Sequence, residues 1–310
     1  MMTTPPRSIV YFNGQFVPLE EATVNVRTHA FMYGTSIFEG IRAYYLPDTD
    51  QMAIFRLREH YQRFYANAKM CYMEPPISLE ELEAVTVEVV KQNKHTQKDT
   101  YIRPMVYKGG VDVIGPNIDK APTCLTVWTQ PLGDYVSTSK ALNVCISNWR
   151  RVDDNALPPR LKCGGSYMNA ALIVTDAKRG GFDEAIVLTQ DGHVGEGSAM
   201  NLMLVRNGKI ITPPVSDNIL EGITRATLIE LAKKELGLPC EERTIDRTEL
   251  YVADEVFFCG TGAQVAAVGA IDHRLIGSGE MGPITTQLQS LYFDVVRNQV
   301  PAYSSWLTLC

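Results

Sequence analysis

Long apolar runs are missing from this sequence: no stretch approaches the about 20 apolar residues that a bilayer-spanning helix needs. The first residues also lack the apolar core of a signal peptide. Positive charge is scarce, because 29 lysines and arginines face 35 acidic residues. The net charge of −6, with no basic stripe, argues against a nucleic-acid-binding protein. An anionic small substrate stays compatible with this balance, since it needs only local arginines.

Metal-binding and disulfide motifs are missing as well. The seven cysteines are scattered and form no C-x-x-C pair, which is typical of reduced thiols and not of a disulfide framework. The five histidines show neither H-x-H nor H-E-x-x-H spacing, so we expect no metal site. Together these absences lead us to expect a cytoplasmic protein.

What is present describes a globular chain with ample core material. It has 310 residues, of which 45% are hydrophobic and 21% charged, enough for one large domain or two ordinary ones. The stretch from Gln130 to Asp134 carries proline and glycine and interrupts the pattern of strands. We therefore expect a small N-terminal domain over residues 1–129, a linker over 130–139 and a larger C-terminal domain over 140–310.

Turn and helix signals divide both halves into short elements. Asn13-Gly14, Asp191-Gly192 and Asn207-Gly208 predict hairpins. Ser78, followed by acidic residues, predicts a helix start, and Lys178-Arg179-Gly180-Gly181 predicts a helix end. The remaining pattern predicts helices over 57–68, 79–91, 167–179, 223–236 and 283–297, and strands over 53–56, 100–107, 124–129, 142–147 and 255–259.

One lysine stands out by its surroundings. Lys162 is followed by Gly164 and Gly165, and then by Ser166, which is a plausible N-cap of the next helix. A lysine at the positive end of a helix dipole is opposed by about 0.3–1 kcal/mol, so an acid would be expected there. Lys162 is therefore a candidate amine nucleophile. The alternative is a solvated loop lysine, as in a binding or structural module that carries no chemistry.

An anion site is predicted at a second place. Gly222, Ile223 and Thr224 open a helix whose free backbone amides and dipole would attract a phosphate. Arg63 on an earlier helix could add a bidentate clamp, and Thr261 offers a hydroxyl in a glycine-rich turn. Each feature alone also fits an ordinary helix start, a solvated arginine or a simple turn.

A carboxylate completes the set. Glu196 lies between Gly195 and Gly197, where it could pair with a cationic nitrogen or simply end a hairpin. A reactive lysine, a phosphate site and a carboxylate for a ring nitrogen are what pyridoxal phosphate requires. Tyr167, which follows the lysine loop, could hold the phenolic oxygen of the ring.

Motifs in chain order resemble the fold-type IV aminotransferases, and most closely the branched-chain amino-acid aminotransferases. The resemblance covers nearly the whole chain. Its motifs are Tyr33-Gly34, Phe38-Glu39-Gly40-Ile41-Arg42, Arg58-Glu59-His60-Tyr61-Gln62-Arg63, Tyr101-Ile102-Arg103-Pro104, Lys162 with Gly164-Gly165-Ser166-Tyr167, Gly195-Glu196-Gly197, Leu220-Glu221-Gly222-Ile223-Thr224-Arg225 and Gly260-Thr261-Gly262. It implies an α+β fold, with a small N-terminal α/β domain and a larger C-terminal pseudo-barrel domain.

The resemblance also implies roles around a pyridoxal phosphate cofactor. Lys162 would be the Schiff-base lysine and proton carrier, Glu196 would pair with the pyridine nitrogen, and Tyr167 would meet the ring oxygen. Leu220 would pack against the ring. The implied phosphate ligands are Arg63, Gly222, Ile223, Thr224 and Thr261.

For the substrate, the resemblance implies that branched-chain L-amino acids (Leu, Ile, Val) exchange their amino group with 2-oxoglutarate, giving branched 2-oxo acids and L-glutamate. The α-carboxylate would meet Tyr101, Arg103 and the turn of Thr261, Gly262 and Ala263. Tyr33, Phe38, Gly40 and Tyr135 would line the pocket. A neighbouring subunit would complete the site, so a homodimer is expected as the minimal unit, with a homohexamer as the larger alternative.

Two departures from the family pattern leave the substrate range open. The loop over residues 109–116 differs from the usual branched-chain version, and Ser198-Ala199-Met200 precedes Asn201 where another glutamate is frequent. A D-amino-acid or (R)-amine transaminase, or a 4-amino-4-deoxychorismate lyase, would use the same skeleton. Tyr101 and Arg103, which share one face of a predicted strand, favour branched-chain transamination.

Overall fold

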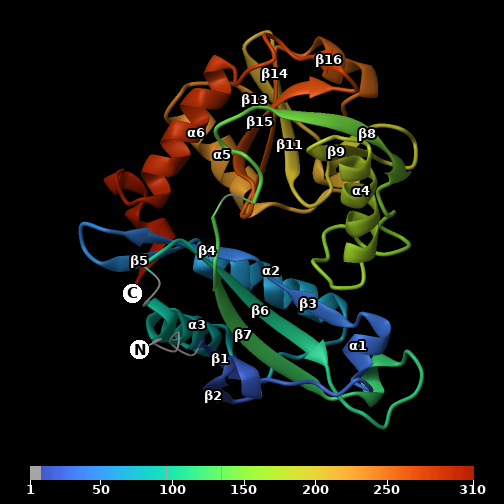
Figure 1. The fold of residues 1–310 in the computed structure, drawn as a ribbon, viewed down its shortest axis with the longest axis vertical. Helices are drawn as coiled ribbons and strands as arrows, with labels where there is room; N and C mark the ends of the chain where they lie inside the picture. The colour runs from blue at the N-terminus through green and yellow to red at the C-terminus, as the bar shows by residue number, and fades with distance from the viewer. Residues whose placement is uncertain (1–7, 95–96, 134) are drawn as a thin grey trace, which may run out of the picture. The chain divides into compact units, whose positions relative to one another are not determined.

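The computed structural model describes residues 8–94, 97–133 and 135–310 (Figure 1). It divides into two compact units. The first unit holds Met1–Gly133, Lys162–Gly165 and Val296–Cys310, and the second holds Asp134–Leu161 and Ser166–Val295. The linker expected over 130–139 stays a prediction, although the first break between the units falls within it.

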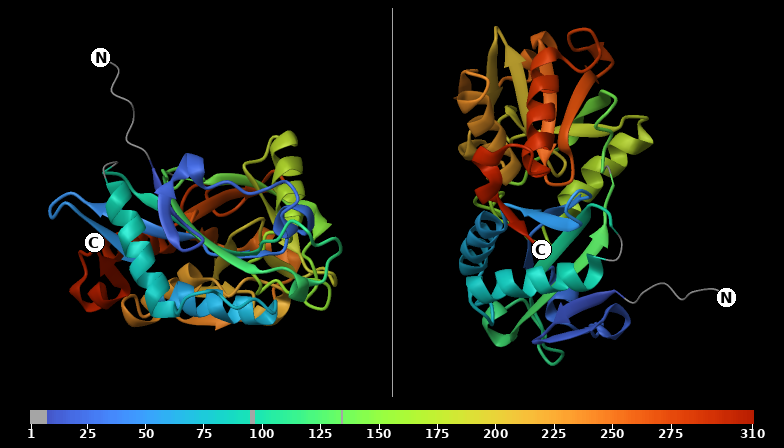
Figure 2. Two further views of the ribbon diagram at one scale, coloured as in Figure 1. Left: turned by 90° about the horizontal axis from the view of Figure 1, so that it is seen from below. Right: turned by 90° about the vertical axis from the view of Figure 1, so that its left-hand side faces the viewer.

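The first unit is built on an eight-stranded sheet in the order β17-β5-β4-β6-β7-β1-β2, with β3 paired to β6. Its strands are β1 (Ile9–Phe12), β2 (Gln15–Pro18), β3 (Ser36–Phe38), β4 (Ile41–Leu46), β5 (Gln51–Phe55), β6 (Thr100–Lys108), β7 (Thr123–Pro131) and β17 (Leu307–Leu309). Its α-helices are α1 (His29–Tyr33), α2 (Leu57–Met70) and α3 (Leu79–Asn93). Helix α3 packs against α2, β1 and β7 (Figure 2).

The second unit is built on a nine-stranded sheet in the order β10-β9-β8-β15-β14-β11-β12-β13, with β16 paired to β15. Its strands are β8 (Leu142–Arg150), β9 (Glu184–Leu188), β10 (Val194–Gly197), β11 (Asn201–Arg206), β12 (Lys209–Thr212), β13 (Cys240–Glu242), β14 (Glu255–Gly260), β15 (Gln264–Ile271) and β16 (Arg274–Leu275). Its helices are α4 (Tyr167–Arg179), α5 (Ile223–Lys234) and α6 (Pro283–Val296), the last of which runs to the edge of the unit. Strand β8 is parallel to β9 and β15, whereas β14 is antiparallel to its neighbours, so the α+β class is confirmed.

Short 3-10 helices join these elements in both units. They cover Leu19–Glu21, Ile118–Lys120, Val215–Asp217, Arg247–Val252 and Pro301–Trp306. The core of the second unit is mainly aliphatic and lies along β11, β14 and β15, where Leu202, Val256, Ala266 and the aromatic Phe258 are almost fully buried. The curled sheet around this core is the half-barrel that the resemblance implies.

The local turn and cap signals are confirmed, with one exception. Asn13 and Gly14 take positive φ values of 48° and 97° between β1 and β2. Ser78 forms a capping box with Glu81 at the start of α3. Ser166 does occupy the N-cap position of α4, but its side chain makes no capping hydrogen bond, so that expectation is wrong. Its backbone is already helical, whereas a capping hydroxyl needs extended backbone to reach the first free amides.

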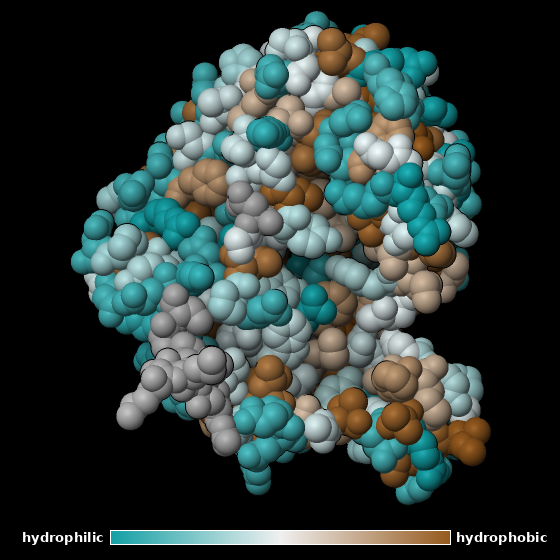
Figure 3. All heavy atoms as spheres, in the orientation of Figure 1, coloured by the Kyte–Doolittle hydropathy of each residue, from teal (hydrophilic) through white to brown (hydrophobic). Residues whose placement is uncertain are grey.

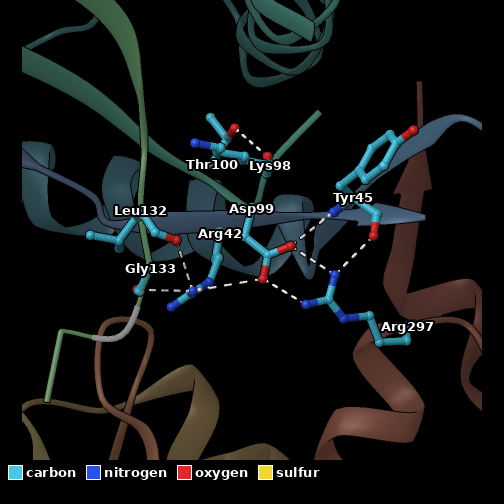
Figure 4. A network of polar contacts seen from close by, with 8 residues as sticks. All are labelled: Arg42, Tyr45, Lys98, Asp99, Thr100, Leu132, Gly133 and Arg297. Atoms are coloured by element: carbon cyan, nitrogen blue, oxygen red, sulfur yellow. Dashed lines mark hydrogen bonds and ion pairs between the residues drawn. The ribbon is translucent and has the colours of Figure 1, made fainter. Parts of the chain in front are cut away.

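Asp99, which precedes β6, ties the C-terminal segment to the sheet of the first unit (Figure 4). Arg297 approaches its carboxylate with both terminal nitrogens at 2.7 Å, and the Tyr45 amide donates to it at 3.0 Å. Arg42 on β4 lies 3.7 Å from the same carboxylate and donates to the Leu132 carbonyl at 3.0 Å. The carboxylate thereby connects β4, the end of β7 and the residue that follows α6.

A carboxylate distant in sequence caps α6. Glu255 on β14 is buried and accepts hydrogen bonds from the Ile284 and Thr285 amides at 2.9 and 2.7 Å, and from the Thr285 hydroxyl at 2.6 Å. Pro283 fits the first helical position because it has no amide to satisfy. A Cβ on Gly282 would lie 2.1 Å from the Glu255 Cδ, so only glycine leaves room for this cap.

We expect Glu255→Ala to lower the free energy of unfolding by about 1–3 kcal/mol, because it leaves the first amides of α6 without an acceptor. Circular dichroism melting curves measure the effect. The matched control is Glu280→Ala, which removes an exposed acid from the loop before the same helix. Equal melting temperatures for the two variants would contradict the assigned cap.

Candidate functional site

The segment that carries Lys162 is attached to the first unit by backbone pairing. The Phe38 amide donates to the Lys162 carbonyl at 3.0 Å, and the Gly164 amide donates to the Ser36 carbonyl at 2.8 Å. Ile37 and Cys163 form an antiparallel bridge between these bonds. Residues 162–165 therefore lie alongside β3 and join it through an isolated bridge, while the residues on either side of them belong to the second unit.

The glycines around the lysine permit this close approach. A Cβ on Gly164 would lie 2.4 Å from the Ser36 hydroxyl. Gly34 has a φ of +69°, and a Cβ there would lie 2.9 Å from the Gly165 Cα. A side chain at these positions would push the two segments apart, so the glycines fix the place of the lysine.

Lys162 and Arg103 lie near the same aromatic ring. The Lys162 Nζ is 5.1 Å from the centre of the Phe38 ring, and the Arg103 Cζ is 4.0 Å from it. Cations at these distances are attracted by the ring's quadrupole. The structure thus brings together three residues that the sequence assigned to the site.

Arg103 is held among aromatic side chains. Its Nε donates to the Tyr101 hydroxyl at 2.8 Å, which confirms that the two side chains share one face of β6. The Trp128 ring, whose centre is 5.7 Å from the Arg103 Cζ, was missed from the sequence, because only the register of β7 against β6 pairs it with Arg103. Gly40 leaves space for Tyr101, since a Cβ on Gly40 would lie 2.8 Å from the Tyr101 hydroxyl.

Arg63 forms a bidentate clamp, and its partner is a buried carboxylate. Its Nε and Nη2 each donate to one oxygen of Glu39 at 2.8 Å. The Nδ1 of His60 lies 2.9 Å from the second oxygen. Burial alone would raise the pKa of Glu39, but the charge of Arg63 and the hydrogen bonds from His60 and Arg63 outweigh it and hold that pKa far below its usual range. Glu39 and His60 lie in motifs that carry the family resemblance, but neither was assigned to the site from the sequence. His60 and Arg63 do have the spacing that places them on one face of α2.

Glu196 on β10 is a buried acceptor in the second unit. The Arg151 Nη2 approaches one of its oxygens at 2.6 Å, and the Asn201 Nδ2 donates to the other at 2.9 Å. The Leu220 amide lies 3.3 Å from that second oxygen. Glu196 is therefore no surface acid at a hairpin end, and Arg151 and Asn201 are partners that the sequence did not indicate.

Helix α5 begins where the sequence predicts. Gly222 is its N-cap and has no side chain to occupy the first amides, while Thr224 is buried in the first turn. A Cβ on Gly222 would lie 1.8 Å from the Asn201 Oδ1, so the glycine lets Asn201 connect this helix start to Glu196. Such a terminus has the free amides and dipole that suit an anion.

The turn between β14 and β15 brings together the other predicted residues of the second unit. Gly260 pairs with Gln264 across the turn formed by Thr261, Gly262 and Ala263. The ring of Tyr135 lies against Gly262, because a Cβ there would be 3.4 Å from the Tyr135 Cγ.

Two predicted residues have other surroundings. The Tyr33 hydroxyl accepts from the Gly115 amide at 2.9 Å and its ring lies 4.7 Å from that of His29, so Tyr33 is attached to the loop that differs from the family pattern. Tyr167 is the first residue of α4. The first unit contains Tyr33, Phe38, Gly40, Arg63, Tyr101, Arg103 and Lys162, and the second contains Tyr135, Tyr167, Glu196, Leu220, Gly222, Ile223, Thr224, Thr261, Gly262 and Ala263.

Metal clusters and membrane-spanning helices are both absent from the residues that the structure describes. Among them, no group of three or more His, Cys, Asp or Glu side chains could hold a metal ion. No helix in the same ranges has both the length and the apolar character needed to cross a membrane.

Comparison with known proteins identifies the family. The family model for amino-transferase class IV matches residues 36–271. A probable branched-chain-amino-acid aminotransferase of Aquifex aeolicus is 45% identical over 308 residues, which cover 99% of this chain and 98% of that protein.

Solved structures agree with this match. A branched-chain amino acid aminotransferase of T.th., complexed with N-(5'-phosphopyridoxyl)-L-glutamate, is 42% identical with a TM-score of 0.91, covering 97% of this chain and 98% of that one. The enzyme of Thermobaculum terrenum in its PLP-form is 35% identical with a TM-score of 0.93, covering 99% of both chains. This chain therefore belongs to the class IV aminotransferases of fold type IV, in the group of the branched-chain-amino-acid aminotransferases.

Proposed function

We propose that this aminotransferase moves the amino group of L-leucine, L-isoleucine or L-valine to 2-oxoglutarate, giving branched 2-oxo acids and L-glutamate. The observation that carries the proposal is the group formed by Lys162, Phe38 and Arg103. The Phe38 ring offers an apolar surface, Lys162 a primary amine beside it, and Arg103 a cation for carboxylates. A branched aliphatic amino acid requires all three.

Pyridoxal phosphate is the cofactor, which the phosphopyridoxyl adduct and the PLP-form of the related enzymes support. The residues present fit its chemical groups: an amine in Lys162, a helix terminus without a side-chain cap in α5, and a buried carboxylate in Glu196. When bound, the cofactor supplies an electron sink for negative charge at the substrate's α carbon.

Residue roles follow from this chemistry. Lys162 would supply the amine that holds the cofactor and would carry the proton of the substrate's α carbon. Glu196 would accept from the ring nitrogen, and its bonds from Arg151 and Asn201 hold it in a fixed orientation. Tyr167 would bind the ring oxygen and Leu220 would pack against the ring. The phosphate ligands are Arg63, Gly222, Ile223, Thr224 and Thr261.

A single pocket has to accept both aliphatic and acidic side chains. We infer that Arg103 serves both the α- and the γ-carboxylate, with Tyr101 and the turn of Thr261, Gly262 and Ala263 as further α-carboxylate ligands. The rings around Arg103 offer apolar faces when the substrate is branched. The remaining pocket residues are Tyr33, Gly40 and Tyr135.

The alternatives are a D-amino-acid or (R)-amine transaminase and a 4-amino-4-deoxychorismate lyase on the same fold. The hydrogen bond between Arg103 and Tyr101 favours the branched-chain activity, because it fixes two carboxylate ligands on one face of β6.

The assembly that we propose is a homodimer, with a homohexamer as the larger alternative. Exposed apolar side chains gather over α1 and the loop after β6 (Figure 3). Phe31 is 70% exposed, Val26 73% and Ile114 90%. A second copy covering this surface would bury a patch that a monomer rarely exposes.

A reducing compartment such as the cytoplasm is our proposal for the location. All seven cysteines are free thiols. Cys259 is fully enclosed, and burial raises the pKa of its thiol to about 12, so it stays protonated and unreactive. Free thiols of this kind are typical of cytosolic proteins.

We expect purified protein to take up pyridoxal phosphate, to be yellow, and to change its visible absorbance when L-leucine is added. Lys162→Ala should abolish that change and lower kcat by about 100- to 10,000-fold, because the proton carrier is lost. Lys140→Ala, which alters an exposed lysine, is the control. Protein that stays colourless with added cofactor would refute the cofactor assignment.

The substrate class is tested by single-turnover absorbance changes with L-leucine, D-alanine and (R)-1-phenylethylamine. We expect L-leucine to react and the other two to leave the spectrum unchanged. A response to the D- or R-compounds alone would contradict the branched-chain assignment.

Arg103→Met tests the shared carboxylate site. Loss of a charged hydrogen-bond donor should raise the KM for L-glutamate by about 10- to 100-fold, and the KM for L-leucine by less, since leucine has no γ-carboxylate. Arg58→Gln on the exposed face of α2 is the matched control. An equal loss for both substrates would show that Arg103 binds only the α-carboxylate.

A further inference from the structure

The ion cluster of Glu39, His60 and Arg63 lies entirely within the first unit. The Glu39 side chain is fully enclosed, His60 is 2% exposed and Arg63 is 12% exposed. Glu39 follows β3, and its amide donates to the Pro104 carbonyl on β6 at 3.0 Å. The backbone of Glu39 is therefore attached to the sheet and not to the helix that carries Arg63.

Stability alone does not account for such a cluster. Desolvating a carboxylate and a guanidinium costs about as much as their attraction returns, and apolar side chains of equal volume usually serve a core as well. The exposures are also unequal: no surface of Glu39 reaches solvent, whereas part of Arg63 does. An external ligand can therefore meet the Arg63 side chain but not the Glu39 carboxylate.

The geometry of the clamp sets the orientation of Arg63. Its Nε and Nη2 both donate to Glu39. Two contacts fix the plane of the guanidinium, whereas a single contact would let it rotate. His60 binds the carboxylate oxygen that also receives the Arg63 Nη2. Since the carboxylate only accepts, the Nδ1 of His60 carries the proton.

Charge balance agrees with this arrangement. Burial is the largest influence on His60 and lowers its pKa, although Glu39 opposes that shift. The His60 ring is therefore neutral when it donates its hydrogen bond to Glu39. Two other groups act on Glu39 and His60. The charge of Lys162 also lowers the pKa of His60. Burial raises the pKa of Tyr61, which therefore stays protonated. The charges of Glu39 and Arg63 then cancel each other. A phosphate dianion would meet a guanidinium whose orientation is already fixed.

We propose that Glu39 and His60 are positioning residues that hold the Arg63 guanidinium for the phosphate of the cofactor. This inference rests on the proposed function, in which Arg63 is a phosphate ligand. Glu39 fixes the orientation of the guanidinium, and we expect that orientation to outweigh the repulsion between the carboxylate and the phosphate.

The test compares pyridoxal phosphate with pyridoxal, which lacks the phosphate, by absorbance titration of cofactor-free protein. We expect Glu39→Gln to weaken pyridoxal phosphate binding by about 10-fold or more and to change pyridoxal binding by less than about 3-fold. In an Arg63→Met background, Glu39→Gln should have no further effect on pyridoxal phosphate, because it acts through Arg63. Glu59→Gln, which removes the ion pair between Glu59 on the same helix and the N-cap residue Arg56, is the matched control.

His60 gives a second and milder pair of variants, should Glu39→Gln fail to fold. His60→Leu removes the donor and should weaken pyridoxal phosphate binding, while His60→Asn keeps a donor near the Nδ1 position and should retain it. Equal losses for pyridoxal and pyridoxal phosphate, tighter binding in Glu39→Gln, or an undiminished effect of Glu39→Gln without Arg63 would each overturn the inference. Wild-type protein that binds neither compound would instead overturn the proposed function, and the inference with it.

Discussion

The backbone pairing between residues 162–165 and β3 is the constraint on which the rest of this site depends. It brings a lysine from the middle of the chain to a ring near the beginning of it. The bonds are between main-chain groups, so they fix the backbone of the lysine without using its side chain. This pairing requires glycine at positions 34 and 164, because residues 162–165 and the segment around β3 are too close for side chains there.

Three arginines show how one residue type is adapted to different tasks. Arg63 is held by a buried carboxylate, Arg151 approaches the carboxylate of Glu196, and Arg103 is surrounded by rings and a phenol. The first two arginines have their charge balanced within the protein. Arg103 is placed by neutral groups, and a cation of that kind retains the greatest attraction for a substrate carboxylate.

Local features of the fold could be predicted from the sequence because their causes are local. Asn-Gly and Asp-Gly pairs give hairpins, and Ser78 with Glu81 gives a capping box. The shared face of Tyr101 and Arg103 follows from the alternation of a strand. Ser166 shows the limit of such reasoning, since the backbone before α4 is already helical and the hydroxyl cannot cap.

The partners of the site residues could not be predicted in the same way. Glu39 meets Arg63 across 24 positions of sequence, and Trp128 reaches Arg103 only through the register of β6 and β7. The cap of α6 by Glu255 spans a similar distance. Family resemblance selected the ligands, but their supporting residues depend on tertiary packing that no local pattern encodes.

The position of β17 has a consequence for how this protein is made. It forms one edge of the first unit's sheet by pairing with β5, although more than 250 positions of sequence separate the two strands. The sheet of the first unit therefore stays incomplete on the ribosome until β17 has been translated, by which time the strands of the second unit have all been made.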